Sequence, residues 1–162
     1  MPIKRDSRTP NGGAFVYDNE GTPQWVQPHD ELLLDALHSW VGGPATMMIH
    51  MQDEMAGLPV PSSGSGKKMR AQAAVLLQEL QQNSRRCPKP LYRGAKVNPV
   101  GLGYQSWTTR RKTAEAFARR NDGTVWELPK GTMGLCVADY LAKHFVGLNA
   151  YFAPEAEWIV WQ

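Results

Sequence analysis

The apolar residues of this chain change their spacing near Pro90, and this change limits the folds that the chain can adopt. Before Pro90 they recur every three to four positions, as on one face of an amphipathic helix, and after it they gather in short runs typical of β-strands. We expect helices over residues 30–41, 44–56 and 67–82. Helices followed by strands, without regular alternation, predict the α+β fold class.

The second half of the chain contains the β-like runs, which turn-forming residues separate. One helix interrupts them. Thr108 or Thr109 can cap its start, and Ala114, Phe117 and Ala118 form its apolar side. The strands that we expect are Leu91–Val97, Gly103–Trp107, Thr124–Leu128, Met133–Val137 and Glu157–Trp161.

The whole chain has 162 residues, which is enough for one domain with its own core. Residues 1–28 are rich in Gly, Pro, Asn and Asp and contain two short β-like runs, so we expect an arm or a hairpin there. Residues 29–90 are the expected helical lead-in, and residues 91–162 are the expected β-rich core. We therefore predict a single domain with three parts.

The formal net charge of +3 conceals an uneven distribution. Residues 1–60 contain three basic and eight acidic side chains, residues 61–120 contain thirteen and two, and residues 121–162 contain two and five. The basic segment has two interpretations: a solvated helix face with phosphate contacts, or a surface that steers the protein toward an acidic partner or a nucleic acid.

Several protein classes do not fit the sequence. No apolar run approaches the roughly 20 residues that span a bilayer, and the start is polar, so we expect a cytoplasmic protein that does not act at a membrane. Delivery into another cell by a dedicated machine would leave no trace in the sequence. Cys87 and Cys136 lie far apart, and the four His residues lack metal-ligand spacing, so we expect neither a disulfide scaffold nor a metal site.

Three β-like segments each contain a polar residue where a buried strand would favour an apolar one: Arg93, Ser106 and Glu157. Glu155 precedes Glu157 by two positions, and on a regular strand both carboxylates would point to one face. Two like charges on one face are unfavourable unless something positive binds there. Taken singly, each residue is more simply explained as a solvent-facing strand residue or as part of a structural salt bridge.

In their order, these segments resemble the mono-ADP-ribosyltransferase family, in the branch whose active site is named for Arg, Ser and Glu. The resemblance covers about Leu91 to Val160. Within the family, the chain is similar to bacterial toxin and phage-type ADP-ribosyltransferases. It includes Ser106-Trp107-Thr108 with the helix that follows, the Pro129-Lys130-Gly131 turn, and Tyr151-Phe152-Ala153-Pro154 before the Glu pair. The fold that it implies is a split mixed or antiparallel β-sheet core.

The resemblance implies NAD as the substrate and no metal. Glu157 would stabilise the cationic ribose and hold its 2′-hydroxyl, Ser106 would fix the rotamer of Glu157, and Arg93 would hold phosphate. The NAD contacts that it implies are Arg93, Gly94, Ser106, Trp107, Thr108 and Glu157. The residues that it implies for acceptor recognition are Tyr151, Phe152 and Glu155.

Because the first Glu of the pair in arginine-modifying members orients the acceptor guanidinium, the resemblance implies transfer of ADP-ribose to protein arginine. The target would be an acidic or nucleic-acid-associated protein, and the enzyme an effector or a modifier of host proteins. Hydrolysis of NAD is the expected side activity. Two alternatives stay open: the same fold acting on a nucleic acid, and a catalytically idle basic module that binds nucleic acid or protein. Trp107 is bulkier than the Thr usual at its position, and the far face of the sheet is the expected place for it.

Overall fold

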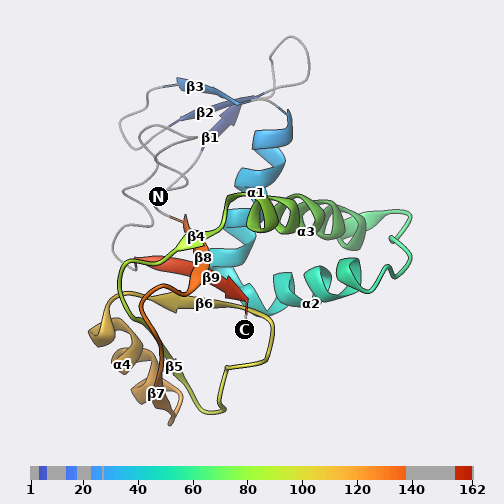
Figure 1. Cartoon of the computed structure of the whole chain (residues 1–162). Helices are drawn as coiled ribbons and strands as arrows, with labels where there is room; N and C mark the ends of the chain where they lie inside the picture. The colour runs from blue at the N-terminus through green and yellow to red at the C-terminus, as the bar shows by residue number, and fades with distance from the viewer. Residues whose placement is uncertain (1–3, 7–13, 18–22, 27, 138–155, 162) are drawn as a thin grey trace. The chain divides into compact units, whose positions relative to one another are not determined.

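The computed structural model describes residues 4–6, 14–17, 23–26, 28–137 and 156–161 (Figure 1). The chain divides into two compact units, residues 1–81 and residues 82–162, which we describe separately. The predicted single domain stays a prediction. No helix among the described residues is long and apolar enough to cross a membrane.

The first unit begins with a three-stranded antiparallel sheet in the order β1-β2-β3. Its strands are β1 (Lys4–Asp6), β2 (Ala14–Tyr17) and β3 (Pro23–Val26). Strands β2 and β3 confirm the two β-like runs of the arm, and β2 also pairs with β1. The sequence did not predict β1, because its three residues are all charged and give no apolar signal.

Three helices complete the first unit, and all three were predicted: α1 (Pro28–Gly42), α2 (Pro44–Met55) and α3 (Gly64–Asn83). Pro44 takes a first-turn position of α2, where its missing N–H is not needed. The Ser39 hydroxyl on α1 donates a hydrogen bond of 2.7 Å to Gln72 Oε1 on α3. The fully buried side chains at the predicted helix-face positions are Leu33, Leu34, Leu37, Trp40, Met47, Met51, Ala73, Leu76 and Leu80.

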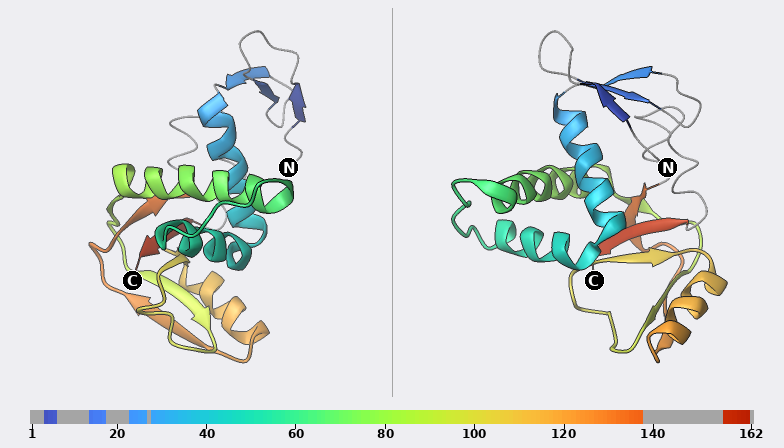
Figure 2. Two further views of the ribbon diagram at one scale, coloured as in Figure 1. Left: turned by 90° about the vertical axis from the view of Figure 1, so that its right-hand side faces the viewer. Right: turned by 180° about the vertical axis from the view of Figure 1, so that it is seen from behind.

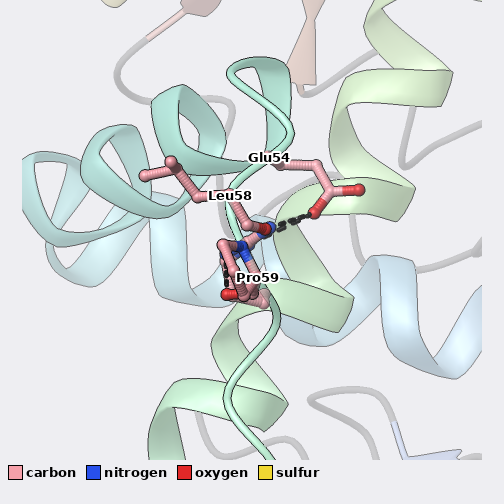
Figure 3. A network of polar contacts seen from close by, with 4 residues as sticks. Glu54, Leu58 and Pro59 are labelled. Carbon is pink, nitrogen blue, oxygen red and sulfur yellow. Dashed lines mark hydrogen bonds and ion pairs between the residues drawn. The ribbon is translucent and has the colours of Figure 1, made fainter.

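One member of the basic segment has a structural role in this unit. Arg70 on α3 is only 4% exposed and donates two hydrogen bonds to Glu54 Oε2, from Nε at 3.2 Å and from Nη2 at 2.8 Å (Figure 3). It also donates to the carbonyls of Leu58 and Pro59 in the connection between α2 and α3. Because a buried charge is stable only when paired, Arg70 is committed to holding this connection and is not available to a partner.

The second unit is built on a six-stranded sheet in the order β4-β8-β9-β6-β5-β7, in which the paired strands are antiparallel. Its elements are β4 (Arg85–Arg86), β5 (Leu91–Ala95), β6 (Tyr104–Thr108), α4 (Arg111–Arg120), β7 (Thr124–Leu128), β8 (Met133–Cys136) and β9 (Glu157–Trp161). Five strands and the helix were predicted. The two-residue strand β4 was not, since it lies where the sequence indicates only a break after α3.

Helices alongside an antiparallel sheet confirm the predicted α+β class. In the second unit, the main core lies on one face of the sheet and contains Cys87, Leu91, Trp107, Leu128, Cys136, Trp158 and Val160. Helix α4 packs against β5, as both views of Figure 2 show. This arrangement places β9, β6 and β5 side by side in the middle of the sheet.

Candidate active site

The three polar residues singled out in the sequence lie on three adjacent strands: Glu157 on β9, Ser106 on β6 and Arg93 on β5. Neighbouring strands lie roughly 4.8 Å apart, so side chains on adjacent strands can touch. Ser106 is the central member and contacts both others. The fold thus brings together the Arg, the Ser and the second Glu, which are distant in the sequence.

A short hydrogen bond joins Ser106 to Glu157. In the register of β6 and β9, Ser106 lies opposite Ile159 and Thr108 lies opposite Glu157, so Ser106 and Glu157 are diagonal neighbours on one face. The Ser106 hydroxyl donates to Glu157 Oε1 at 2.5 Å, a length typical of a hydroxyl bonded to an ionised carboxylate. Glu157 is 5% exposed, so the bond restricts a buried carboxylate.

Arg93 binds the main chain of the same serine. Strands β5 and β6 share a single Cα pair, Tyr92 with Thr108, and a continued ladder would place Gly94 opposite Ser106. Instead, Arg93 Nη1 donates to the Ser106 carbonyl oxygen at 2.7 Å. Figure 1 shows β5 and β7 running at an angle away from β6. The Arg93 guanidinium therefore bonds a carbonyl that the separating strand no longer pairs.

The electrostatics of Arg93 are set by partial burial and by the carboxylate. Burial lowers the pKa of the Arg93 guanidinium from its ordinary value, and Glu157 acts in the opposite direction by favouring the charged form. Arg93 Nε is buried and has no hydrogen-bond partner among the described residues. A buried donor left unpaired costs about 1–3 kcal/mol, so this guanidinium retains capacity for an anionic ligand.

Gly94 and Thr108 have clear structural roles next to this cluster. A Cβ atom at Gly94 would lie 2.2 Å from the Ala114 carbonyl oxygen and 2.4 Å from Ala118 N, so only glycine lets α4 approach β5 this closely. The Thr108 hydroxyl accepts a hydrogen bond from the Arg110 N–H at 3.1 Å. The prediction that Thr108 or Thr109 caps α4 is wrong: the N-cap is Arg110, which makes no side-chain capping bond, and Thr108 still belongs to β6.

Trp107 points away from Ser106, because successive side chains of a strand alternate between faces. It is 1% exposed and lies in the core cluster beside Trp158, its cross-strand partner. The prediction that Trp107 lies on the far face of the sheet from Ser106 is therefore confirmed. For a ligand on the Ser106 face, Trp107 can offer only its main chain.

Ala156, which immediately precedes Glu157, has a φ of 45°, in the left-handed region that L-residues other than Gly, Asn and Asp rarely occupy. Strand β9 begins only at Glu157. Glu155 lies outside the described residues, so the expectation that both carboxylates point to one face stays a prediction. The sequence offers no signal for this turn, because an alanine does not favour it.

Tyr151, Phe152 and Glu155 lie outside the described residues, and their roles in acceptor recognition stay predictions.

Comparisons with known protein families, with curated proteins and with solved structures find no match to this chain.

Proposed function

We propose that this protein transfers ADP-ribose from NAD to an arginine side chain of a protein and releases nicotinamide. One observation carries the proposal: the buried Glu157 carboxylate receives a 2.5 Å hydrogen bond from Ser106, whose own carbonyl receives a bond from Arg93. The two charged residues are thus each bonded to the serine between them, and the Glu157 carboxylate favours the charged form of Arg93.

In the proposed reaction, the bond between C1′ of the ribose and the nicotinamide nitrogen breaks, and its electron pair leaves with nicotinamide. Positive charge then develops at C1′ and the ring oxygen, and a carboxylate held beside that centre stabilises it. Glu157 supplies this carboxylate. A hydrogen bond that is already made before the reaction holds the carboxylate in one rotamer, so no reorganisation is needed as charge develops.

Arg93 is the residue that we assign to phosphate. A guanidinium is always charged near neutral pH and has five N–H donors in a planar fork, which suits a pyrophosphate. One donor is used on Ser106, and the buried Nε has no described partner, so a phosphate oxygen would satisfy it. Because β5 separates from β6, the guanidinium reaches the Ser106 carbonyl that a continued ladder would have paired.

The acceptor assignment rests on the resemblance and on Glu155. An arginine nitrogen forms the new bond to C1′, and the proton that it loses passes to Glu155. Water can attack the same cation, which gives ADP-ribose and nicotinamide, so slow hydrolysis of NAD is the expected side reaction.

The test is labelling with NAD that carries a radioactive phosphate, in a cell lysate, followed by mass spectrometry for ADP-ribosylated arginine. Wild-type protein is expected to label discrete proteins, and Glu157→Gln is expected to abolish both labelling and nicotinamide release. The matched control is Glu127→Gln, the same chemical change at an exposed position of β7, which should retain activity. Full activity in Glu157→Gln would overturn the proposal.

The same experiment separates the alternatives. Label that nuclease removes and protease leaves would identify a nucleic acid as the acceptor. Absence of both labelling and nicotinamide release from the wild-type protein would favour a binding module without catalysis.

A further inference from the structure

Many basic side chains of the second unit already have a role within the fold. Arg93 bonds Ser106, Arg85 stacks on the Trp158 ring at 4.7 Å, and Arg86 donates to the Gly131 carbonyl. Arg111 forms an ion pair with Glu115 and lies over the Tyr92 ring, which fixes the start of α4 against β5. These contacts explain part of the positive charge by structure alone.

Helix α4 retains charge that such contacts do not explain. Lys112 and Arg119 are exposed, and neither has an ion-pair or hydrogen-bond partner among the described residues. The first turn of α4 contains no acidic residue, although cations there oppose the positive end of the helix dipole. Arg119 and Arg120 lie in the last turn, where positive charge stabilises the helix. Lys112 lies in the first turn, where its positive charge destabilises the helix.

These charges form one surface. Lys112 and Arg119 are seven residues apart, which puts them on the same side of the helix about 10 Å apart along its axis. Ala114 and Ala118 are buried and define the opposite side. Lys96, which is exposed, lies near the end of α4, because a Cβ atom on Gly123 would be only 2.8 Å from Lys96 N. Arg120 and Phe117 lie further round the helix, about 80° and about 140° from Lys112, so the four side chains occupy the half of α4 that Ala114 and Ala118 do not. We call these four residues, together with Lys96, the α4 surface.

An exposed aromatic ring distinguishes this surface from a simple patch of charge. Phe117 is 40% exposed, and the Arg120 guanidinium lies over its ring at 5.1 Å from the centroid. A ring and a planar guanidinium on the same exposed half of the helix as free cations match what single-stranded nucleic acids present, namely unpaired bases for stacking and phosphates for the cations. An acidic peptide would use the cations and leave the ring unused, and a duplex would keep its bases stacked inside.

We propose that the α4 surface binds single-stranded nucleic acid, with phosphates at Lys96, Lys112 and Arg119 and a base stacked at Phe117 and Arg120. The inference does not depend on the proposed function, since none of these residues belongs to the Arg93, Ser106 and Glu157 cluster. Glu157→Gln is therefore expected to keep full binding even if it loses all labelling.

The test is fluorescence anisotropy of a labelled oligouridine RNA of roughly twenty nucleotides, titrated with the full chain at several salt concentrations. Three phosphate contacts predict that log K falls with log salt with a slope of about −2. A parallel series with oligothymidine distinguishes RNA from DNA as the source of the single strand. An RNA duplex and an oligoglutamate peptide test the two competing partners.

The key variant is Lys112→Glu with Arg119→Glu, expected to weaken binding about tenfold or more and to reduce the slope to about −1. The first change favours the helix dipole and the second opposes it, so the effects on folding should largely cancel. The matched control, Lys67→Glu with Lys68→Glu, reverses two exposed lysines of α3 with the same change in net charge and should alter affinity less than about twofold. Equal losses in both double variants would overturn the proposal.

A second variant tests the ring. Phe117→Leu keeps an apolar side chain of similar burial and removes the stacking surface, and we expect about fivefold weaker binding to oligothymidine but unchanged binding to an abasic strand of equal length. Unchanged affinity for both strands would overturn the stacked base, and so would oligoglutamate or duplex binding as tight as that of the single strand.

Discussion

The Ser106 hydroxyl donates a 2.5 Å hydrogen bond to Oε1 of Glu157, across strands β6 and β9 and on one face of the sheet. A serine hydroxyl has a short reach, so this bond requires the register that the two strands adopt. It fixes the orientation of a buried carboxylate before any ligand binds.

Removing the Ser106 hydroxyl should impair catalysis more than binding. A hydrogen bond to a charged group contributes about 1.5–3 kcal/mol, so Ser106→Ala is expected to lower kcat for nicotinamide release roughly 10- to 100-fold while changing KM for NAD little. Ser106→Thr keeps the hydroxyl and should recover part of kcat. Equal kcat values for the Ala and Thr variants would contradict a positioning role for the hydroxyl.

Replacing the guanidinium of Arg93 with an ammonium group should impair NAD binding. Arg93→Lys keeps the positive charge and loses the planar fork, so we expect KM for NAD to rise about tenfold with a smaller change in kcat. The control is Arg86→Lys, at an exposed arginine of the same unit. Steady-state kinetics of nicotinamide release gives KM and kcat for both variants. A change in kcat alone in Arg93→Lys would argue against phosphate binding.

Adding one methyl group at Gly94 should destabilise the protein. Its Cβ would overlap the backbone of α4, which cannot move without loosening its contact with β5, so Gly94→Ala is expected to lower the free energy of unfolding by about 2 kcal/mol or more. Gly43→Ala is the control, since a Cβ there meets nothing within 4 Å and φ is −165°. Urea unfolding followed by circular dichroism should show the smaller loss in Gly43→Ala.

Glycine at position 156 should relieve backbone strain. The left-handed conformation costs an alanine roughly 1–2 kcal/mol, and the greater freedom of glycine in the unfolded chain offsets about half of this. We therefore expect Ala156→Gly to raise the free energy of unfolding by about 0.5 kcal/mol, measured by urea unfolding. Asp122→Gly, at φ 51°, should give a smaller gain in the free energy of unfolding, because aspartate tolerates this conformation better than alanine does. A larger gain at position 122 would contradict a strained Ala156.

Apolar spacing alone was enough to predict most of the secondary structure. Helix α3 shows why: its residues Ala73, Leu76 and Leu80 recur at helical spacing, and all three are buried. Strands β7 and β9 were predicted with their observed bounds. The failures, β1 and β4, are strands of charged residues, which form because a neighbouring strand offers main-chain hydrogen bonds and not because of any side-chain pattern.

The candidate site was predicted only as a set of residue types. Arg93, Ser106 and Glu157 were singled out because polar residues interrupt β-like runs, but a single strand cannot indicate its neighbours. Only the strand order β9-β6-β5 makes Ser106 the central residue. The bond from Arg93 to the Ser106 carbonyl could not be predicted, because it depends on where β5 leaves β6.

By itself the sequence determined the succession of helices and strands, because apolar periodicity is a local property that each segment carries alone. It also determined that positive charge gathers in the middle of the chain. Tertiary structure decided which of those charges are structural, as Arg70 is, and which stay exposed, as Lys112 does. It also decided that Ser106 and Glu157 share one face, because strand register is set by packing and main-chain hydrogen bonds between segments far apart in the chain.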